Sequence, residues 1–475
     1  MMRFRHVRLW LAGAIAGAFA LRALLLIDAT ALWSDELYSV GKSFQASPAE
    51  LLLMLRQDTH PPLYYGLLWC WGQLVGQSPV TLRLLSWLAY VSGGVVMVLQ
   101  ARALCPDRRM VMPLAVLFSF CSPYPVRFAI EGKSYALLVL LVALAWWWRR
   151  KRSSFLYGIA VALAGLTHFY GLFITLSAAA WDGCQRRTRL MAAALLGALP
   201  ALIWIAYAAG YLFSPRAGSW IGPPEFSLLE DSLARALGIW PLPKLLLLAL
   251  TFWMLRRWGG LEPVPWGDMR LLDRSGLVPS ALMVLVVVTV SFVKPLAFSR
   301  YFVVLLPALV TTLAVLCGRF RLNLSGRRWG AAVLAVMLTS WWATGFSELA
   351  SGRGGVREQD QFRMISQRAE GLTERFSPRS RLLNLSDRME LSMGRISPPT
   401  APWMDHSALQ ERLQTLPRPE ELWLASSGPP TALQTKLKPF LQLVEQAGYQ
   451  CRNRSVDLTH GRLLQCRSMS RVPVP

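Results

Sequence analysis

Long apolar runs separated by short basic clusters fill the first three quarters of the chain. Crossing a bilayer takes about 20 apolar residues of α-helix. The run 63–75 is too short for that, so we expect it to lie along the interface. The longer runs predict about eleven transmembrane helices, over about 9–27, 80–101, 110–126, 134–148, 154–181 (an out-and-back pair bent near His168), 190–212, 241–255, 277–294, 301–317 and 329–346.

Charge sets the expected orientation of these helices, because cytoplasmic loops carry an excess of Lys and Arg. With a cytoplasmic N-terminus and the spans above, every basic cluster falls inside, the C-terminus lies outside, and residues 28–79 form a long outer loop. If 154–181 were one helix, the predicted membrane orientation of every later helix would be reversed. The clusters are Arg3, Arg5 and Arg8; Arg108 and Arg109; Arg149, Arg150, Lys151 and Arg152; Arg186, Arg187 and Arg189; Arg256 and Arg257; and Arg319, Arg321, Arg327 and Arg328.

The composition becomes polar and charged from about Ser351. Helices are expected near 358–375 and 431–447, the second being amphipathic. Strands are expected at Arg381–Leu385, at Leu422–Ala425 and twice more towards the C-terminus. Alternating elements of this kind predict a small α/β domain.

The predicted fold class is therefore a polytopic α-helical membrane protein with a small C-terminal α/β soluble domain. The transmembrane domain covers 1–348 and includes the outer loop 28–79. The soluble domain covers 349–475 and lies on the outer, periplasmic face.

Two cysteines fall in the last two expected strands. If these strands pair about a turn centred on Leu458–Thr459, Cys451 and Cys466 are directly opposite each other. An oxidising outer location permits a disulfide there. The alternative is two free thiols.

Composition agrees with a membrane protein. Of 475 residues, 54% are hydrophobic and 16% are charged, against about 25% charged in soluble proteins. The net charge of +23 could suggest nucleic acid, but the basic residues sit in short clusters and form no continuous basic face, so nucleic-acid binding is excluded.

Polar residues concentrate in the outer loops. Asp35 and Glu36 lie beside the membrane and are candidates for a general base or a metal site. Adjacent carboxylates on a helix point about 100° apart, so the two need not face one centre. The alternative is a helix N-terminus with Ser34 as N-cap and acidic residues in the first turn.

A second polar segment joins two of the predicted helices on the same side. Arg127 and Lys133 could grip an anionic group at the interface, and Glu131 could hold one of them through an ion pair. The alternative is a solvated hairpin tip. Arg300 is a further cation in an outer loop, against the positive-inside bias. His168 marks a helix bend, where a lone histidine is often a satisfied structural group.

Five segments, in this order, resemble the motifs of bacterial GT-C glycosyltransferases. The closest group is related to protein O-mannosyltransferases, lipid A aminoarabinose transferases and lipopolysaccharide-core sugar transferases of rhizobia. The resemblance covers about residues 1–320 and does not identify the substrate. The segments are Trp33-Ser34-Asp35-Glu36-Leu37-Tyr38, Thr59-His60-Pro61-Pro62-Leu63-Tyr64-Tyr65, Glu131-Gly132-Lys133-Ser134-Tyr135-Ala136-Leu137, Thr167-His168-Phe169-Tyr170 and Ser299-Arg300-Tyr301-Phe302.

The resemblance implies transfer of a sugar from a polyprenyl-phosphate donor to an acceptor hydroxyl, with inversion, on the outer face of a bacterial inner membrane. Asp35 matches the family's first-loop carboxylate and would be the base, with Glu36 beside it. Members differ in whether these two carboxylates bind a divalent cation such as Mg²⁺ or Mn²⁺, so that point stays open. The donor phosphate would be bound by Arg127, Lys133 and Arg300. The supporting residues would be Asp58, His60, Glu131, Tyr135, His168, Tyr170 and Tyr301.

The partners implied are the lipid-linked donor, a lipid, glycan or protein acceptor, and membrane lipids. The alternative function is a transporter or flippase of a lipid-linked or small polar solute. That class predicts repeats and ionisable groups near the bilayer midplane. The sequence has no repeat, and its carboxylates lie in outer loops.

Overall fold

The computed structural model describes residues 2–215, 217–218, 221–237, 249, 253, 256–257, 259–261, 267–347, 356–398, 401–428, 430–454 and 460–469. The contacts divide the chain into two compact units. The helical unit comprises Met1–Leu25, Gln45–Cys70 and Arg83–Ser347, and the α/β unit comprises Leu26–Phe44, Trp71–Leu82 and Glu348–Pro475. The α/β unit thus contains two parts of the loop 28–79 as well as the C-terminal residues.

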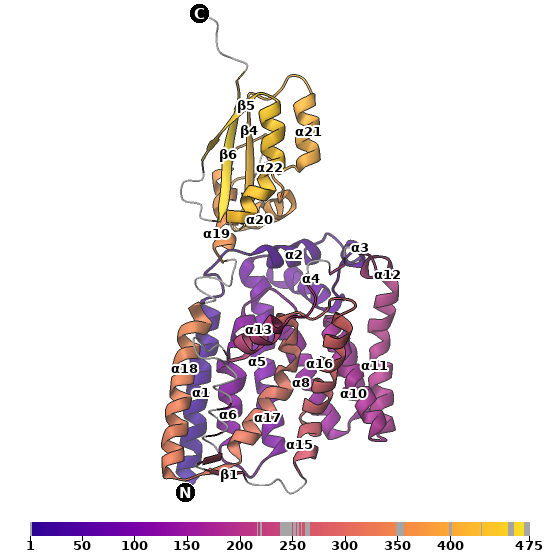
Figure 1. Cartoon of the computed structure of the whole chain (residues 1–475), viewed down its shortest axis with the longest axis vertical. Helices are drawn as coiled ribbons and strands as arrows, with labels where there is room; N and C mark the ends of the chain where they lie inside the picture. Colours follow the sequence, from indigo (N-terminus) through magenta and orange to yellow (C-terminus); the bar gives the residue numbers. More distant parts are fainter. Residues whose placement is uncertain are drawn as a thin grey trace, which may run out of the picture. The chain divides into compact units, whose positions relative to one another are not determined.

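Helices of the helical unit lie side by side along their length (Figure 1). Helices α4 and α5 also contribute residues to the α/β unit. The unit is built from α1 (Met2–Leu25), α3 (Pro48–Arg56), α4 (Leu63–Val75), α5 (Pro79–Leu104), α6 (Val111–Cys121), α7 (Pro123–Ala129), α8 (Tyr135–Lys151), α9 (Ser154–Thr167), α10 (Phe169–Cys184), α11 (Thr188–Tyr207), α12 (Ala209–Leu212), α13 (Phe226–Leu237), α15 (Asp268–Arg274), α16 (Leu277–Ser291), η1 (Ser299–Leu305), α17 (Leu306–Gly318) and α18 (Leu324–Ser347), with the antiparallel strands β1 (Gly259–Leu261) and β2 (Phe320–Leu322).

Several of these helices are long and apolar enough to cross a membrane. The described residues contain four such helices, or five if α15 and α16, bent by 67° against each other, form one span. This confirms the class of polytopic helical membrane protein. The total of about eleven spans stays a prediction, because the helix expected over 241–255 lies largely outside the described residues. The four helices are Val7–Leu25, Pro79–Leu104, Thr188–Tyr207 and Ser299–Gly318.

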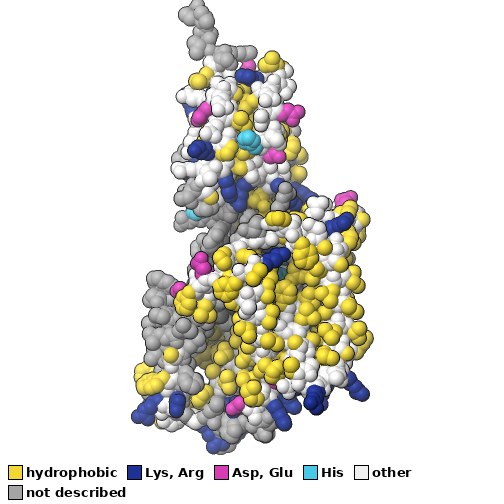
Figure 2. Space-filling model, turned by 45° about the vertical axis from the view of Figure 1, so that its right-hand side comes forward, with side chains coloured by type: hydrophobic (Ala, Val, Ile, Leu, Met, Phe, Trp, Pro, Cys, Tyr) yellow, Lys and Arg dark blue, Asp and Glu magenta, His cyan; other side chains and the backbone are white. Residues whose placement is uncertain are grey.

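Large apolar side chains are exposed on the outside of this unit. Figure 2 shows an extensive apolar face over the helices, with Lys and Arg side chains gathered along its lower end. Leaving such side chains in water costs about 25 cal/mol per Å² of apolar surface, whereas lipid tails accept them. Examples are Phe155, Leu196, Ile203, Leu285 and Val336.

The segment 154–181 forms two helices, as predicted. His168 has extended backbone angles (φ −161°, ψ 142°) and separates α9 from α10. The two helices pack closely: a Cβ on Gly171 would come within 2.3 Å of the carbonyl oxygen of Ala164, so this crossing needs glycine. Tyr157 and Ala179, at similar distances either side of the bend, share one apolar cluster.

One other predicted span is broken, and another changes from 3₁₀ to α-helix without a break. The segment expected as one helix over 110–126 divides at Ser122 (ψ 152°) into α6 and α7, because the residue before Pro123 is restricted to extended angles. The segment expected over 301–317 begins as the 3₁₀ turn η1 and continues as α17.

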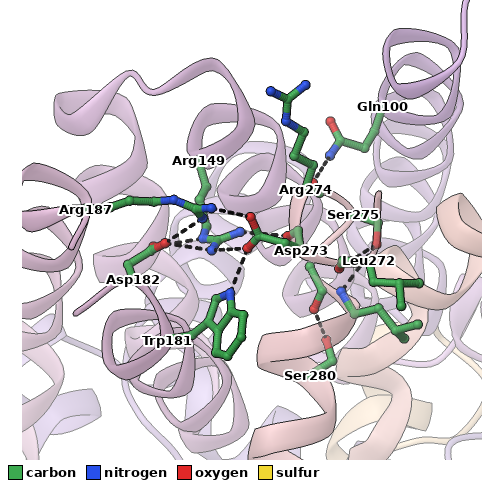
Figure 3. Close-up of polar contacts among 12 residues, drawn as sticks. Gln100, Arg149, Trp181, Asp182, Arg187, Leu272, Asp273, Arg274, Ser275 and Ser280 are labelled. Carbon is green, nitrogen blue, oxygen red and sulfur yellow. Dashed lines mark hydrogen bonds and ion pairs between the residues drawn. The ribbon is translucent and has the colours of Figure 1, made fainter. Parts of the chain in front are cut away.

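Three buried charges, Arg149, Asp182 and Asp273, and the partly exposed Arg187 connect α8, α10 and α15 (Figure 3). Arg149 donates from Nη2 to Asp182 Oδ1 at 2.7 Å and to Asp273 Oδ1 at 2.8 Å. Arg187 pairs with the same two carboxylates at 3.1 and 2.6 Å, and Trp181 Nε1 donates to Asp273 at 2.9 Å. Two of the arginines assigned to loop clusters by charge pattern are therefore ion-paired.

The α/β unit contains a four-stranded sheet in the order β3-β4-β6-β5, with β3 parallel to β4 and the other pairs antiparallel. Leu409, Leu437 and Phe440 of the helices α21 and α22 pack with Leu422 and Leu424 of the sheet in one core. The elements are α2 (Ser34–Ser43), α19 (Val356–Arg368), β3 (Arg375–Phe376), α20 (Ser380–Ser392), α21 (His406–Gln414), β4 (Glu421–Ser427), α22 (Pro430–Gln446), β5 (Tyr449–Asn453) and β6 (Gly461–Ser468).

A disulfide joins the last two strands. Cys451 and Cys466 are paired across β5 and β6 and form this bond. The predicted cross-strand pairing is confirmed. The turn expected at 458–459 lies outside the described residues.

The strand predicted over Arg381–Leu385 is wrong, because these residues begin helix α20. Their buried positions continue downstream with helical spacing: Leu382 and Leu383 are followed by Ser386, Asp387 and Met389. A segment of five residues is too short to distinguish the helical period of about 3.6 residues from the strand period of 2.

Breaking the buried charge network should destabilise the helical unit. Asp182→Ala leaves Arg149 buried without one of its two carboxylates, and we expect a loss of about 3–5 kcal/mol. Thermal unfolding of the purified protein in detergent measures this. Arg467→Ala is the control, because Arg467 is largely exposed and its pair with Glu421 is worth at most about 1 kcal/mol. Equal unfolding temperatures for the two variants would contradict a stabilising role for the network.

Candidate functional site

Asp35 and Glu36 lie in the first turn of α2, in the α/β unit. The N-cap residue is Trp33, so the assignment of Ser34 as N-cap is wrong. The acidic residues still suit the positive end of the helix dipole. Glu36 is 1% exposed and Asp35 is half-buried, as expected for neighbours about 100° apart on a helix. Asp35 therefore has the more accessible carboxylate.

Asp58 and His60 form a pair in the helical unit, between α3 and α4. Asp58 Oδ1 lies 2.7 Å from His60 Nδ1 and accepts the backbone N–H of His60 at 3.0 Å. A carboxylate held this way fixes the ring and leaves Nε2 as the nitrogen that can contact another group. The expected supporting role of both residues is compatible with this geometry.

The turn from Glu131 to Lys133 is buried rather than solvated. Glu131 is 2% exposed and Lys133 is 5% exposed. The Ser86 hydroxyl of α5 donates to the carbonyl oxygens of Glu131 at 2.6 Å and Lys133 at 3.3 Å. The alternative of a solvated hairpin tip is therefore wrong for these two charges.

Lys133 lies two residues before the first residue of α8, next to the N-cap residue Ser134. Ser134, the N-cap residue, makes no side-chain cap hydrogen bond to the helix. Within the part of the chain that the structure describes, the Lys133 ammonium group makes no hydrogen bond or ion pair. A cation and free backbone N–H groups at a helix N-terminus together form a ready site for an anion.

The two arginines of the predicted phosphate set are placed differently. Arg127 is half-buried in the last turn of α7. Arg300 lies in η1, with its guanidinium carbon 4.9 Å from the centre of the Phe298 ring. Both belong to the helical unit, as Lys133 does.

Five aromatic side chains from four of the motif segments meet in what we call the His–Tyr cluster: His60, Tyr135, His168, Tyr170 and Tyr301. His168 is central, with its ring centre 4.9 Å from Tyr301, 5.7 Å from Tyr170, 5.8 Å from His60 and 5.9 Å from Tyr135. The motifs that are far apart in sequence thus converge in the helical unit.

His168 holds this cluster in place through its backbone position. It is the N-cap of α10, and its Nδ1 accepts the backbone N–H of Tyr170 at 3.2 Å. The pKa of His168, in the turn between the two helices, is held well below its usual value by burial, with His60, Lys133 and Arg300 adding to the effect. His168 is therefore neutral at pH 7. The charges of Lys133 and Arg300 both contribute to lowering its pKa.

Comparison with solved structures identifies the architecture. The chain matches the crystal structure of ArnT from Cupriavidus metallidurans in the apo state with a TM-score of 0.62 and 14% identity, over 95% of this chain and 97% of that one. It matches ArnT from the same organism bound to undecaprenyl phosphate with a TM-score of 0.60 and 13% identity, over the same shares of both chains. ArnT is a lipid A aminoarabinose transferase with the GT-C fold.

This chain has the GT-C fold. The resemblance seen in the motifs is confirmed at the level of the fold. No protein-family model matches the sequence, and no curated protein matches it.

Two residues that contact the motif segments were not predicted from the sequence. Ser86 holds the Glu131–Lys133 turn, and Arg235 of α13 donates from Nε to Ser299 Oγ at 2.9 Å, beside Arg300. Neither lies in a motif, and a single serine or arginine in a helix carries no local signal of such a contact. Among the described residues no group of three or more His, Cys, Asp and Glu side chains could hold a metal ion.

Removing the Ser86 hydroxyl should weaken the turn that holds Lys133. Ser86→Ala removes one donor to the carbonyl of Glu131, which still accepts the backbone N–H of Lys133 at 2.7 Å, so we expect a loss of about 0.5–1.5 kcal/mol of stability, measured by thermal unfolding in detergent. Ser280→Ala is the matched control, because Ser280 is equally buried but its hydroxyl bonds only to Gly276 within its own helix, at 2.7 Å. A Ser86 variant as stable as the Ser280 variant would show that the turn does not need the hydroxyl.

Proposed function

We propose that this protein is a glycosyltransferase that moves a sugar from a polyprenyl-phosphate donor to an acceptor hydroxyl. One observation carries the proposal: Lys133 is 5% exposed, and among the described residues its ammonium group makes no hydrogen bond or ion pair. A cation in apolar surroundings is costly when it is not neutralised. An anionic ligand would remove that cost, and the ArnT structure bound to undecaprenyl phosphate supports a lipid phosphate as the anion.

The leaving phosphate is the group that most needs stabilisation in such a transfer. As the bond from the sugar to the phosphate breaks, negative charge develops on the phosphate oxygens. Preorganised cations and backbone N–H groups stabilise that charge most strongly where water is excluded. Lys133, Arg127 and Arg300 are the cations proposed for this role, with the N-terminus of α8 beside Lys133.

The acceptor hydroxyl supplies the other half of the reaction. Its oxygen attacks the anomeric carbon, the phosphate departs with the bonding electrons, and the hydroxyl proton passes to Asp35. A single displacement of this kind inverts the anomeric carbon, through a transition state with oxocarbenium character. Asp35 is proposed as the base because its carboxylate is half-buried, whereas that of Glu36 is fully buried.

The His–Tyr cluster suits the neutral parts of the substrates. Aromatic faces pack against apolar surfaces and their hydroxyl edges reach polar ones, which matches a sugar ring. With His168 neutral, that residue adds no positive charge that would compete with the cations for the phosphate. The charge pattern supports a cytoplasmic N-terminus and a C-terminal domain on the outer face, and the likeness to ArnT supports a bacterial inner membrane as the location.

The direct test is a transfer assay. The purified protein is incubated in detergent with radiolabelled polyprenyl-phosphate sugars and a membrane lipid extract. Label that moves to a new product supports the transferase. Binding or movement of a labelled solute without any transfer would favour the transporter instead.

Neutralising Lys133 should impair the reaction of the donor. We expect Lys133→Met to lower kcat/KM for the donor by about ten- to hundredfold, the cost of losing a hydrogen bond to a charged group. Lys133→Arg should keep part of the activity, because the positive charge remains but its geometry differs. Lys294→Met is the control, since Lys294 is an exposed lysine of the same unit. Wild-type kinetics for Lys133→Met would remove the observation that carries the proposal.

Removing the proposed base should slow chemistry rather than binding. Asp35→Asn is expected to lower kcat by about 10²–10⁴-fold, with little change in donor KM, in the same radiolabel assay. Because Asp35 and Glu36 point in different directions, we expect EDTA to leave the wild-type rate within about twofold. A rate restored only by added Mg²⁺ or Mn²⁺ would contradict a metal-independent base, and unchanged transfer by Asp35→Asn would remove Asp35 from that role.

A further inference from the structure

One face of helix α20 is directed at helix α2 rather than at the core of the α/β unit. The side chains of this face recur at intervals of four, three and four residues, which places them in one stripe on the helix. We call it the α20 stripe; its members are Arg381, Leu385, Arg388 and Ser392.

The first part of the stripe packs along α2. A Cβ built on Gly41, near the end of α2, would come within 3.0 Å of Leu385 Cδ1. The guanidinium carbon of Arg381 lies 5.8 Å from the centre of the Tyr38 ring, within the range of a cation–π contact. Tyr38 and Gly41 are one helical turn apart on α2, so the two helices meet along matching faces.

Arg388 binds the end of α2. Its Nη2 donates to the carbonyl oxygen of Phe44, the C-cap residue, at 2.9 Å. The last carbonyls of a helix have no partner within the helix, and a cation there also suits the negative end of the dipole.

Neighbouring contacts hold the chain on both sides of α2. Ser392 Oγ donates to the carbonyl oxygen of Gln77 at 3.4 Å. Arg395, just after α20, pairs with Asp28 at 3.2 Å. The segments that precede and follow the loop carboxylates are therefore both attached to the C-terminal part of the same unit.

Helix α2 needs such support because it is short. It has 10 residues, and isolated helices below about 12–15 residues are marginal in water. Its N-cap residue also makes no side-chain cap hydrogen bond to the helix. Contacts with α20 supply packing and a C-terminal cation to a helix that has little stability of its own.

We propose that the α20 stripe is a clamp that fixes α2, and that Arg388 is a positioning residue for Asp35. The clamp itself does not depend on the proposed function, whereas its effect on catalysis rests on the transferase function proposed above. Arg388 binds the last turn of the helix whose first turn carries the base, so loss of the clamp displaces the base without touching the phosphate-binding cations.

Cross-linking tests the clamp without any assay of activity. Gly41→Cys with Leu385→Cys should form an intramolecular disulfide on mild oxidation of native membranes, detected as a linked peptide pair by mass spectrometry. Gly41→Cys with Arg467→Cys is the control pair, and we expect no link. Equal linking of both pairs, or of neither, would overturn the clamp whether or not the protein is a transferase.

Kinetics test the positioning role. We expect Arg388→Ala to lower kcat by about ten- to hundredfold, since small displacements of a reacting group have effects of that size, with the donor KM within about twofold of wild type. Arg388→Lys should recover part of the loss, because an ammonium group can also donate to the Phe44 carbonyl. Arg467→Ala is the control, because its side chain is 69% exposed.

The outcomes separate the two proposals. A kcat for Arg388→Ala equal to that of Arg467→Ala, in an active enzyme, would overturn the positioning role. No transferase activity in the wild-type protein, together with a cross-link in the Gly41→Cys/Leu385→Cys variant, would overturn the proposed function and leave the clamp. A raised donor KM with unchanged kcat would place Arg388 in binding rather than in the positioning of the base.

Discussion

A charge in apolar surroundings must be neutralised, and this constraint organises the helical unit. Helix α8 meets it in different ways at its two ends. In its last turn, Arg149 is held by Asp182 and Asp273 at 2.7 and 2.8 Å. Just before its first residue, Lys133 is almost as deeply buried, yet the described residues give its ammonium group no partner. The chain completes one end with its own carboxylates, and on our proposal the donor phosphate completes the other.

The same constraint explains where helices are interrupted. Backbone groups freed by a break inside an apolar unit need partners. At the α9–α10 break His168 accepts the backbone N–H of Tyr170, and the Ser86 hydroxyl satisfies the carbonyl of Glu131 in the turn before α8. The tyrosine hydroxyl of Tyr170 donates to the carbonyl of Leu296 at 2.9 Å. Two of the motif residues, His168 and Tyr170, therefore also provide partners for the interrupted backbone.

Most of the fold that could be predicted from the sequence followed from local patterns. The bend at His168 followed from apolar length and charge, and the pairing of Cys451 with Cys466 followed from strand register. The nature of 381–385 did not, since five residues fit either period, and the break at Ser122 was hidden inside a continuous apolar run although Pro123 marks it. The burial of Lys133 also needed tertiary structure, because a polar turn between two helices reads as solvated until its neighbours are known.

The placement of α2 could not be predicted from the order of the motifs, for a different reason. The loop that carries it alternates between the units: Leu26–Phe44 and Trp71–Leu82 belong to the α/β unit, and Gln45–Cys70 between them belongs to the helical unit. The hydrogen bond from Arg388 to Phe44 joins residues 344 positions apart. The order of the motifs groups the carboxylates with the cations proposed to bind phosphate, but it does not reveal that a different part of the chain supports the carboxylates. The C-terminal residues are thus part of the structure that holds the proposed base.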